Sequence, residues 1–126
     1  IKQGRHRVFA DFHGDGVRRG LLFLAALELL KDTGLLIEEI ETSQHPKALK
    51  NLAKHMVDLA KRNNVQLFIT THSYHDALKY FYFAFENPEQ RREEFRCILL
   101  KRREGVVEAE VRDDFESIIR ELYPTG

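Results

Sequence analysis

The sequence is short of cysteine, of net charge and of long apolar runs, and each shortage excludes a class of protein. Cys97 is the only cysteine among 126 residues, which excludes an intramolecular disulfide and indicates a reducing compartment such as the cytoplasm. Basic and acidic side chains number 20 each, so no net charge attracts the chain to nucleic acid or to an anionic membrane. The longest apolar run, residues 21–27, is far shorter than the roughly 20 residues that span a bilayer. We expect a cytoplasmic protein that makes no membrane contact and that reaches nucleic acid only through domains absent from this chain.

The pattern of apolar residues predicts one α/β domain, residues 1–126, with a mainly parallel sheet flanked by helices and with a C-terminal β-hairpin and helix. Short aliphatic runs alternate with segments of helical periodicity, and the short connections favour parallel pairing of successive strands. The run at residues 35–40 suits a strand that is buried on both faces, and the apolar helix before it suits burial on several sides. We predict strands at residues 7–10, 35–40 and 65–71, helices at residues 17–31, 46–63, 73–85 and 113–123, and a hairpin of residues 95–101 and 106–112.

Two acids and a histidine follow successive predicted strands. Glu38 and Glu39 stand near the end of one strand, and His72 directly follows the next. The carboxyl ends of parallel strands meet at one edge of a sheet, which is where open α/β sheets bind ligands. One carboxylate can hold a hydrated magnesium ion there while its neighbour orients water, and the histidine can hydrogen-bond to a terminal phosphate.

A Gly-Asp-Gly segment, residues 14–16, leads into the first long predicted helix. Glycines permit a ligand to approach the backbone closely, and the free N–H groups at a helix start can receive an anion such as a nucleotide phosphate. Each of these features also has a plain structural interpretation. Acids after a strand can begin a solvated loop, glycines are common in loops, and Ser73 with Asp76 has the spacing of a capping box.

The order and spacing of these segments, with His45-Pro46 at the start of the helix between the two strands, resemble the C-terminal half of an ABC-type ATPase domain. The likeness is to the OLD-like and AAA-type ATP-binding proteins, which are P-loop NTPases, and it covers nearly the whole chain. The resemblance implies that Gly14, Asp15 and Gly16 form the signature motif, which binds the γ-phosphate of ATP held by the opposite subunit. That motif more often carries serine where Gly14 stands, so backbone contacts replace a hydroxyl donor here.

The same resemblance assigns the strand with the paired acids to the Walker B motif. It implies that Glu38 takes the magnesium-associated position, which is usually aspartate, and that Glu39 is the general base toward the attacking water. His45-Pro46 falls at the D-loop, and His72 matches the switch histidine that senses the γ-phosphate. ATP and Mg²⁺ are therefore the expected ligands, with Glu39 and His72 as the expected catalytic residues.

The sequence contains no G-x-x-x-x-G-K-[ST] loop, the Walker A motif. That loop holds the β- and γ-phosphates through its backbone and lysine, and its hydroxyl coordinates magnesium. We therefore expect the chain to be the C-terminal part of a larger ATPase domain whose Walker A segment lies upstream, rather than a degenerate paralogue. The chain alone is expected to be inactive, and the intact protein to form a head-to-tail homodimer around ATP.

Two other functions stay open at this stage. Asp11 and His13, after the strand at residues 7–10, resemble the D-x-H-G opening of metallophosphoesterases, but the later Gly-Asp and Gly-Asn-His motifs of that class are missing. Two transition ions per purified chain would support that alternative. The third interpretation is a non-catalytic interaction module. The sequence does not indicate the biological process that an ATPase of this kind serves.

Overall fold

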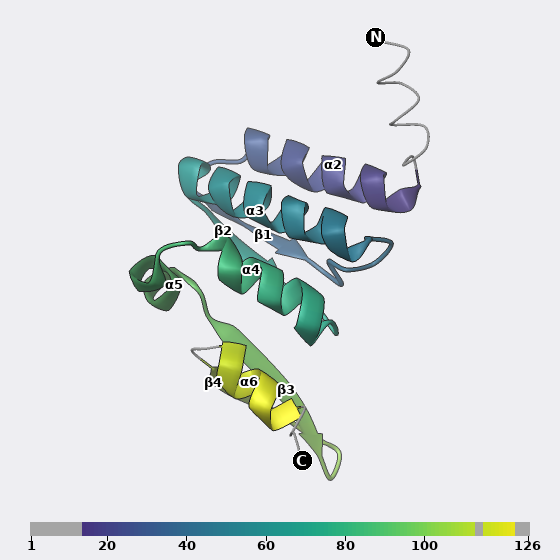
Figure 1. The fold of residues 1–126 in the computed structure, drawn as a ribbon, viewed down its shortest axis with the longest axis vertical. Helices are drawn as coiled ribbons and strands as arrows, with labels where there is room; N and C mark the ends of the chain where they lie inside the picture. Colours follow the sequence, from purple (N-terminus) through teal and green to yellow (C-terminus); the bar gives the residue numbers. More distant parts are fainter. Residues whose placement is uncertain (1–13, 113–114, 123–126) are drawn as a thin grey trace.

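The structure, a computed structural model, describes residues 14–112 and 115–122. Figure 1 shows two units, which we call the α/β unit, residues 14–84, and the hairpin unit, residues 97–112 with 115–122. In the α/β unit, helix α2 (Asp15–Leu29) lies beside α3 (Pro46–Asn63), and α3 packs on the strands and on α4 (Lys79–Ala84). Helix α5 (Pro88–Glu94) connects the two units.

The strands β1 (Thr33–Ile37) and β2 (Val65–Ile69) form a parallel pair. Their register runs from Thr33 opposite Val65 to Ile37 opposite Ile69, so both strands end at the same edge. Helix α3 makes the connection between them, as parallel pairing requires. The predicted parallel pairing of these two strands is therefore confirmed.

Helix α3 begins and ends where its sequence predicts. Pro46 takes the first helical position, where its missing N–H costs nothing, and Nδ1 of His45 accepts a hydrogen bond of 3.2 Å from the Lys47 N–H. Asn64 ends the helix in the left-handed conformation, with φ of 54°. One face of α3 is buried and supplies half of the core: Leu49, Leu52, Ala53, Met56, Val57 and Ala60.

That core lies between α2, α3, α4 and one face of the β1–β2 pair. Leu27 of α2, Ile40 beyond β1, and Leu49 and Met56 of α3 are fully buried. Burying an aliphatic side chain contributes about 1.5–3 kcal/mol, so these few residues dominate the stability of the α/β unit. Ile40 matters for the site, because it anchors the chain directly after Glu39.

The helix predicted at residues 73–85 begins with a π-helical turn, η1 (Tyr74–Leu78), that continues into α4. The Ser73 carbonyl accepts a hydrogen bond of 3.1 Å from Leu78, and the Ser73 hydroxyl accepts one of 3.4 Å from Ala77. Ser73 therefore caps the helix as predicted, but the capping box with Asp76 does not form, because the widened turn presents the N–H of Ala77 to Ser73. Asp76 accepts from the Tyr80 hydroxyl instead.

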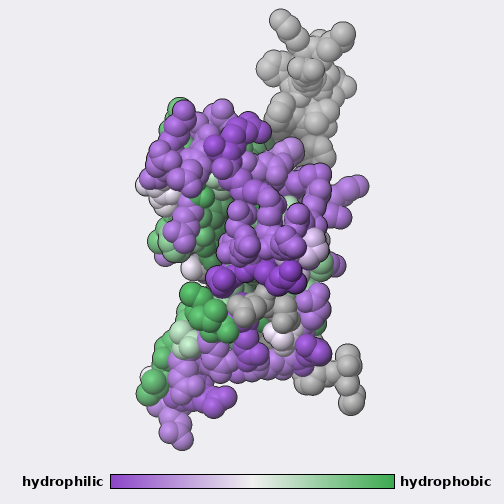
Figure 2. Space-filling view, turned by 90° about the vertical axis from the view of Figure 1, so that its left-hand side faces the viewer, coloured by the Kyte–Doolittle hydropathy of each residue, from purple (hydrophilic) through white to green (hydrophobic). Residues whose placement is uncertain are grey.

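The hairpin unit consists of β3 (Cys97–Arg103), β4 (Val106–Arg112) and α6 (Phe115–Leu122). Glu104 and Gly105 make the two-residue turn with φ of 50° and 79°, as a hairpin turn with two positive φ angles requires. Helix α6 covers one face of the hairpin and buries Ile118 completely. The opposite face is apolar and open, and Figure 2 shows such side chains gathered over the lower half of the molecule. Its exposed members are Ile98, Leu100, Val107 and Val111.

Three expectations need correction within the described residues. The strand predicted to be buried on both faces is covered on one only, because Leu36 and its neighbour Phe68 on β2 are 63% and 50% exposed. Helix α2 is buried on one side rather than several, since Leu22 and Leu29 are exposed. The described strands form one parallel and one antiparallel pair, so the mainly parallel sheet is seen only in β1 and β2.

The segment at Pro88 forms a helix that was not expected, and two expectations concern the ends of the chain. Helix α5 was not predicted, although Asn87 caps it by accepting a hydrogen bond of 2.8 Å from the Glu89 N–H. The strand expected at residues 7–10 and the start of the last expected helix, residues 113–114, lie outside the described residues. In the described ranges, no helix is long and apolar enough to cross a membrane.

Candidate functional site

The carboxyl ends of β1 and β2 bring together the two residues predicted to be catalytic. Glu39 follows β1, His72 follows β2, and Nε2 of His72 lies 3.8 Å from Oε1 of Glu39. Their side chains are 83% exposed for His72 and 59% exposed for Glu39, so both are accessible from solvent. A carboxylate beside an imidazole can accept a proton from water while the imidazole donates a hydrogen bond to an anion. Glu38 is also exposed at this edge.

The main chain of Glu39 is held from two directions. Its φ of 49° lies in the left-handed region, which residues other than glycine seldom adopt. Its N–H donates to Oγ1 of Thr70 at 2.9 Å, and its carbonyl accepts from Nη2 of Arg19 at 3.1 Å. Sequence reasoning missed both partners, because neither Thr70 nor Arg19 is near Glu39 along the chain.

Glu41, a third acid in the same loop, fixes the turn that carries His72. Its carboxylate accepts hydrogen bonds from Oγ1 of Thr71 at 2.6 Å and from the His72 N–H at 2.9 Å. Partial burial raises the pKa of Glu41, but the hydrogen bonds from Thr71 and His72 outweigh it, so the pKa lies below its usual value. The acid-apolar-acid pattern of Glu39-Ile40-Glu41 was the sequence signal for a second acid on the side of Glu39, because Ile40 is buried between the two.

The glycine loop, residues 14–16, forms the start of α2. Gly14 is the N-cap residue and no side chain caps this helix end. A Cβ on Gly16 would lie 2.0 Å from the Ser43 carbonyl oxygen, whereas a Cβ on Gly14 would meet nothing within 4 Å. Gly16 is therefore required by a contact inside the chain itself. The side chain of Asp15 lies outside the described part of the structure.

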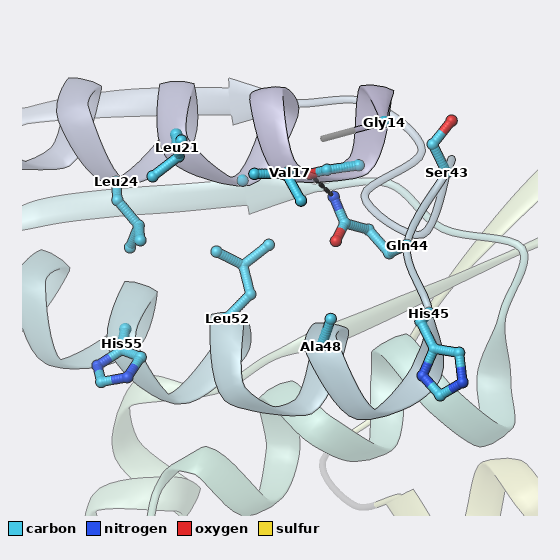
Figure 3. Close-up of a pocket in the computed structure, with 12 residues that line it drawn as sticks. Gly14, Val17, Leu21, Leu24, Ser43, Gln44, His45, Ala48, Leu52 and His55 are labelled. Carbon is cyan, nitrogen blue, oxygen red and sulfur yellow. Dashed lines mark hydrogen bonds between the residues drawn. The ribbon is translucent and has the colours of Figure 1, made fainter. Parts of the chain in front are cut away.

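An open groove of about 370 Å³ runs between α2 and α3 from the glycine loop (Figure 3). Its walls are mainly apolar, with Leu21 and Leu24 of α2 facing Leu52 of α3. At one end the Gln44 side-chain amide donates to the Gly16 carbonyl at 2.7 Å. This hydrogen bond ties the glycine loop to the loop that follows β1.

The expected magnesium position at Glu38 is not tested by the geometry of the described residues. Among the described residues, no three His, Cys, Asp or Glu side chains are grouped so that they could hold a metal ion. Glu38 stays a candidate as one ligand of a shared magnesium shell. Asp11 and His13, the basis of the phosphoesterase alternative, lie outside the described residues. Burial raises the pKa of the Cys97 thiol, and the nearby Arg112 charge opposes this effect without cancelling it. The raised pKa favours the neutral thiol.

Comparison with known proteins identifies the family of the chain. Residues 10–77 match the family described as AAA ATPase domain, a range that includes every candidate residue and ends before the hairpin unit. The uncharacterized protein MJECL11 of Methanocaldococcus jannaschii is 32% identical over 112 residues, which cover 89% of this chain and 93% of that protein. No solved structure matches the chain. The chain therefore belongs to the AAA ATPase domain family, whose members are P-loop NTPases that bind and hydrolyse ATP.

Proposed function

We propose that this chain supplies the Walker B, switch-histidine and signature parts of an ATP-hydrolysing domain of the ABC and OLD-like type. The observation that carries the proposal is the Glu39–His72 pair at the shared carboxyl edge of two parallel strands. In this role Glu39 accepts a proton from the attacking water, and His72 donates a hydrogen bond to the terminal phosphate of ATP. Both side chains are exposed, so a substrate can reach them.

The magnesium-associated role falls to Glu38 in this proposal. Its carboxylate is exposed next to Glu39, and oxygen ligands of this kind suit Mg²⁺. When bound, the ion neutralises phosphate charge during transfer. Glu38 cannot supply a magnesium shell by itself, so the remaining ligands belong to ATP, to water and to a Walker A segment.

That Walker A segment is the partner that the proposal requires. The sequence has no phosphate-binding loop, and the face of the β1–β2 pair that carries Leu36 and Phe68 is apolar and exposed in the described residues. Parallel sheets are normally covered on both faces. A further segment of the ATPase domain, carrying the phosphate loop, would bury this face and complete the active site.

The glycine loop supports a second part of the proposal, a head-to-tail homodimer. Its backbone N–H groups at the uncapped start of α2 suit the terminal phosphate of ATP held by a facing subunit. Gly14, Asp15 and Gly16 are the residues assigned to this contact. Each subunit would then use Glu39 for its own ATP and its glycine loop for the ATP of the other.

Two measurements of ATP hydrolysis test the proposal. The 126-residue chain alone should release no phosphate from Mg-ATP, because the main grip on the nucleotide is missing. Expressed together with the coding sequence immediately upstream, the protein should hydrolyse ATP, and Glu39→Gln should slow it by about 10²- to 10⁴-fold while ATP binding persists. Turnover by the chain alone, or unchanged turnover in Glu39→Gln, would refute the assignment.

A further inference from the structure

Arg19 connects α2 to the loop that follows β1, which we call the acid loop, residues 38–44. Nη2 of Arg19 donates to the carbonyl oxygens of Glu38 at 3.3 Å and of Glu39 at 3.1 Å. Its guanidinium carbon lies 5.2 Å from the centre of the Phe23 ring, one turn further along α2. Its Nε–H is buried without a hydrogen-bond partner among the described residues. The contact with Phe23 holds the guanidinium, and its charged Nη2 fixes the carbonyl groups of Glu38 and Glu39. The unsatisfied Nε–H is a cost of this arrangement.

The backbone conformation of Glu39 determines where its carboxylate points. Glu39 has the strained φ of 49°, and such a conformation persists only where its surroundings hold it. Thr70 holds the N–H side and Arg19 the carbonyl side. If one of the two contacts is lost, the backbone can relax and the carboxylate turns away from His72.

Helix α2 touches the acid loop at both ends of that loop. Arg19 contacts its beginning, while Gly16 packs against the Ser43 carbonyl and accepts from Gln44 near its end. The glycine loop and Arg19 belong to the first two turns of one helix. A displacement of the start of α2 therefore moves Arg19 and, with it, the carbonyl groups of Glu38 and Glu39.

We propose that Arg19 is a positioning residue that makes the orientation of Glu39 depend on the position of α2, and hence on whether the glycine loop holds a phosphate. Its catalytic consequence rests on the proposed function, in which Glu39 is the general base. In a head-to-tail dimer, the terminal phosphate bound by one subunit's glycine loop then adjusts the base that acts on that subunit's own ATP. In each subunit, Arg19 thus couples the ATP bound at the glycine loop to hydrolysis of the ATP that Glu39 serves.

Hydrogen exchange in the full 126-residue chain tests the positioning role without any nucleotide. Arg19→Met should make the Glu39 amide exchange about tenfold faster, as the loss of a charge-assisted hydrogen bond predicts, with Thr70→Val as the positive control. Arg18→Met is the matched control, since it removes the same charge from an exposed neighbour on α2. Equal exchange at Glu39 in the Arg18→Met and Arg19→Met variants would overturn the proposal.

Kinetics of the protein expressed with its upstream segment tests the catalytic consequence. Arg19→Met should lower kcat by about 10- to 100-fold, the effect of a misplaced catalytic group, with KM for ATP within about twofold. Arg19→Lys, which keeps a cationic donor, should recover part of the loss. If Arg19→Met lowers kcat no more than Arg18→Met does, the coupling is refuted even where Glu39→Gln is inactive. If the wild-type protein hydrolyses no ATP, the proposed function fails, while the exchange result still decides the role of Arg19.

Discussion

The α/β unit and the hairpin unit are stabilised in different ways. The α/β unit has a continuous apolar core built from two long helices, two strands and the turn at η1. Among the hairpin-unit side chains that the structure describes, Leu99 and Ile118 are buried, and four charged side chains join α6 to the strands. In that network Glu121 contacts Lys101 and Arg112, and Glu110 lies 2.6 Å from Arg112.

The candidate site lies on the unit with the larger core. Glu39 and Ser43 both have positive φ in the acid loop, and buried Ile40 lies between them. Strain of about 1–3 kcal/mol per residue persists only where packing determines the conformation. In the hairpin unit the described positive φ angles are those of Glu104 and Gly105, where the two-residue turn between paired strands requires them. A large core therefore allows the α/β unit to hold the backbone of Glu39 and Ser43 in the left-handed conformation beside the candidate site.

The largest expected effect comes from breaking the core beneath the site. Ile40→Ala should destabilise the protein by about 2–5 kcal/mol, because the fully buried side chain leaves a cavity next to Glu39. Urea unfolding measures the loss. Leu36→Ala, on the open face of the same strand, should cost less than about 0.5 kcal/mol. Similar losses for both substitutions would mean that the open face of β1 is buried in solution.

Gly16→Val should come next, at about 1–3 kcal/mol of overpacking cost, because its Cβ would meet the Ser43 carbonyl at 2.0 Å. Thermal unfolding, followed by circular dichroism, gives the loss. Gly14→Ala is the control, since a Cβ there has open space. A Gly16→Val protein as stable as Gly14→Ala would show that the glycine loop does not pack on the acid loop.

Ser73→Ala and His72→Ala separate a cap from a functional side chain. Ser73→Ala should cost about 0.5–2 kcal/mol, at the low end because the bond to Ala77 is 3.4 Å long. His72→Ala should cost less than about 0.5 kcal/mol, since its side chain is 83% exposed, and the proposed function requires it to lower ATP hydrolysis once a Walker A segment is supplied. If the His72→Ala protein is less stable than the wild type but its ATP turnover per folded molecule is normal, His72 does not sense the phosphate.

The smallest effect is a pH dependence of the hairpin unit. The hydrogen bond from Arg112, opposed by desolvation and assisted by Lys101, lowers the pKa of Glu110 from its ordinary value. A lowered folded-state pKa stabilises the fold above the unfolded value, and this contribution is lost as the pH falls through the folded pKa. The protection of the β3 and β4 amides, measured against their intrinsic exchange rate at the same pH, should therefore fall as the pH drops below the ordinary range of a glutamate carboxyl. Glu110→Gln should weaken that response, and an unchanged response would assign it to other acids.

Much of the α/β unit follows from local patterns. Pro46, the apolar face of α3 and Asn64 act within one or two turns, so they predict the helix almost to the residue. The hairpin turn at Glu104 and Gly105 is equally local. The π-helical turn after Ser73 is not, because it depends on how η1 packs against α3 and α6. The exposure of Leu36 also escapes prediction, since an aliphatic strand has the same sequence whether or not a second layer covers it.

The sequence by itself determined the residue types of the candidate site and their place at strand ends, because period and turn chemistry are encoded over a few neighbouring residues. It also determined the absence of a phosphate loop. Only the tertiary structure decided that Glu39 meets His72, that Gly16 packs against Ser43, and that Arg19 and Thr70 hold the Glu39 backbone. These contacts join residues 20 or more positions apart, and their geometry exists only after the core has brought α2, β1 and β2 together.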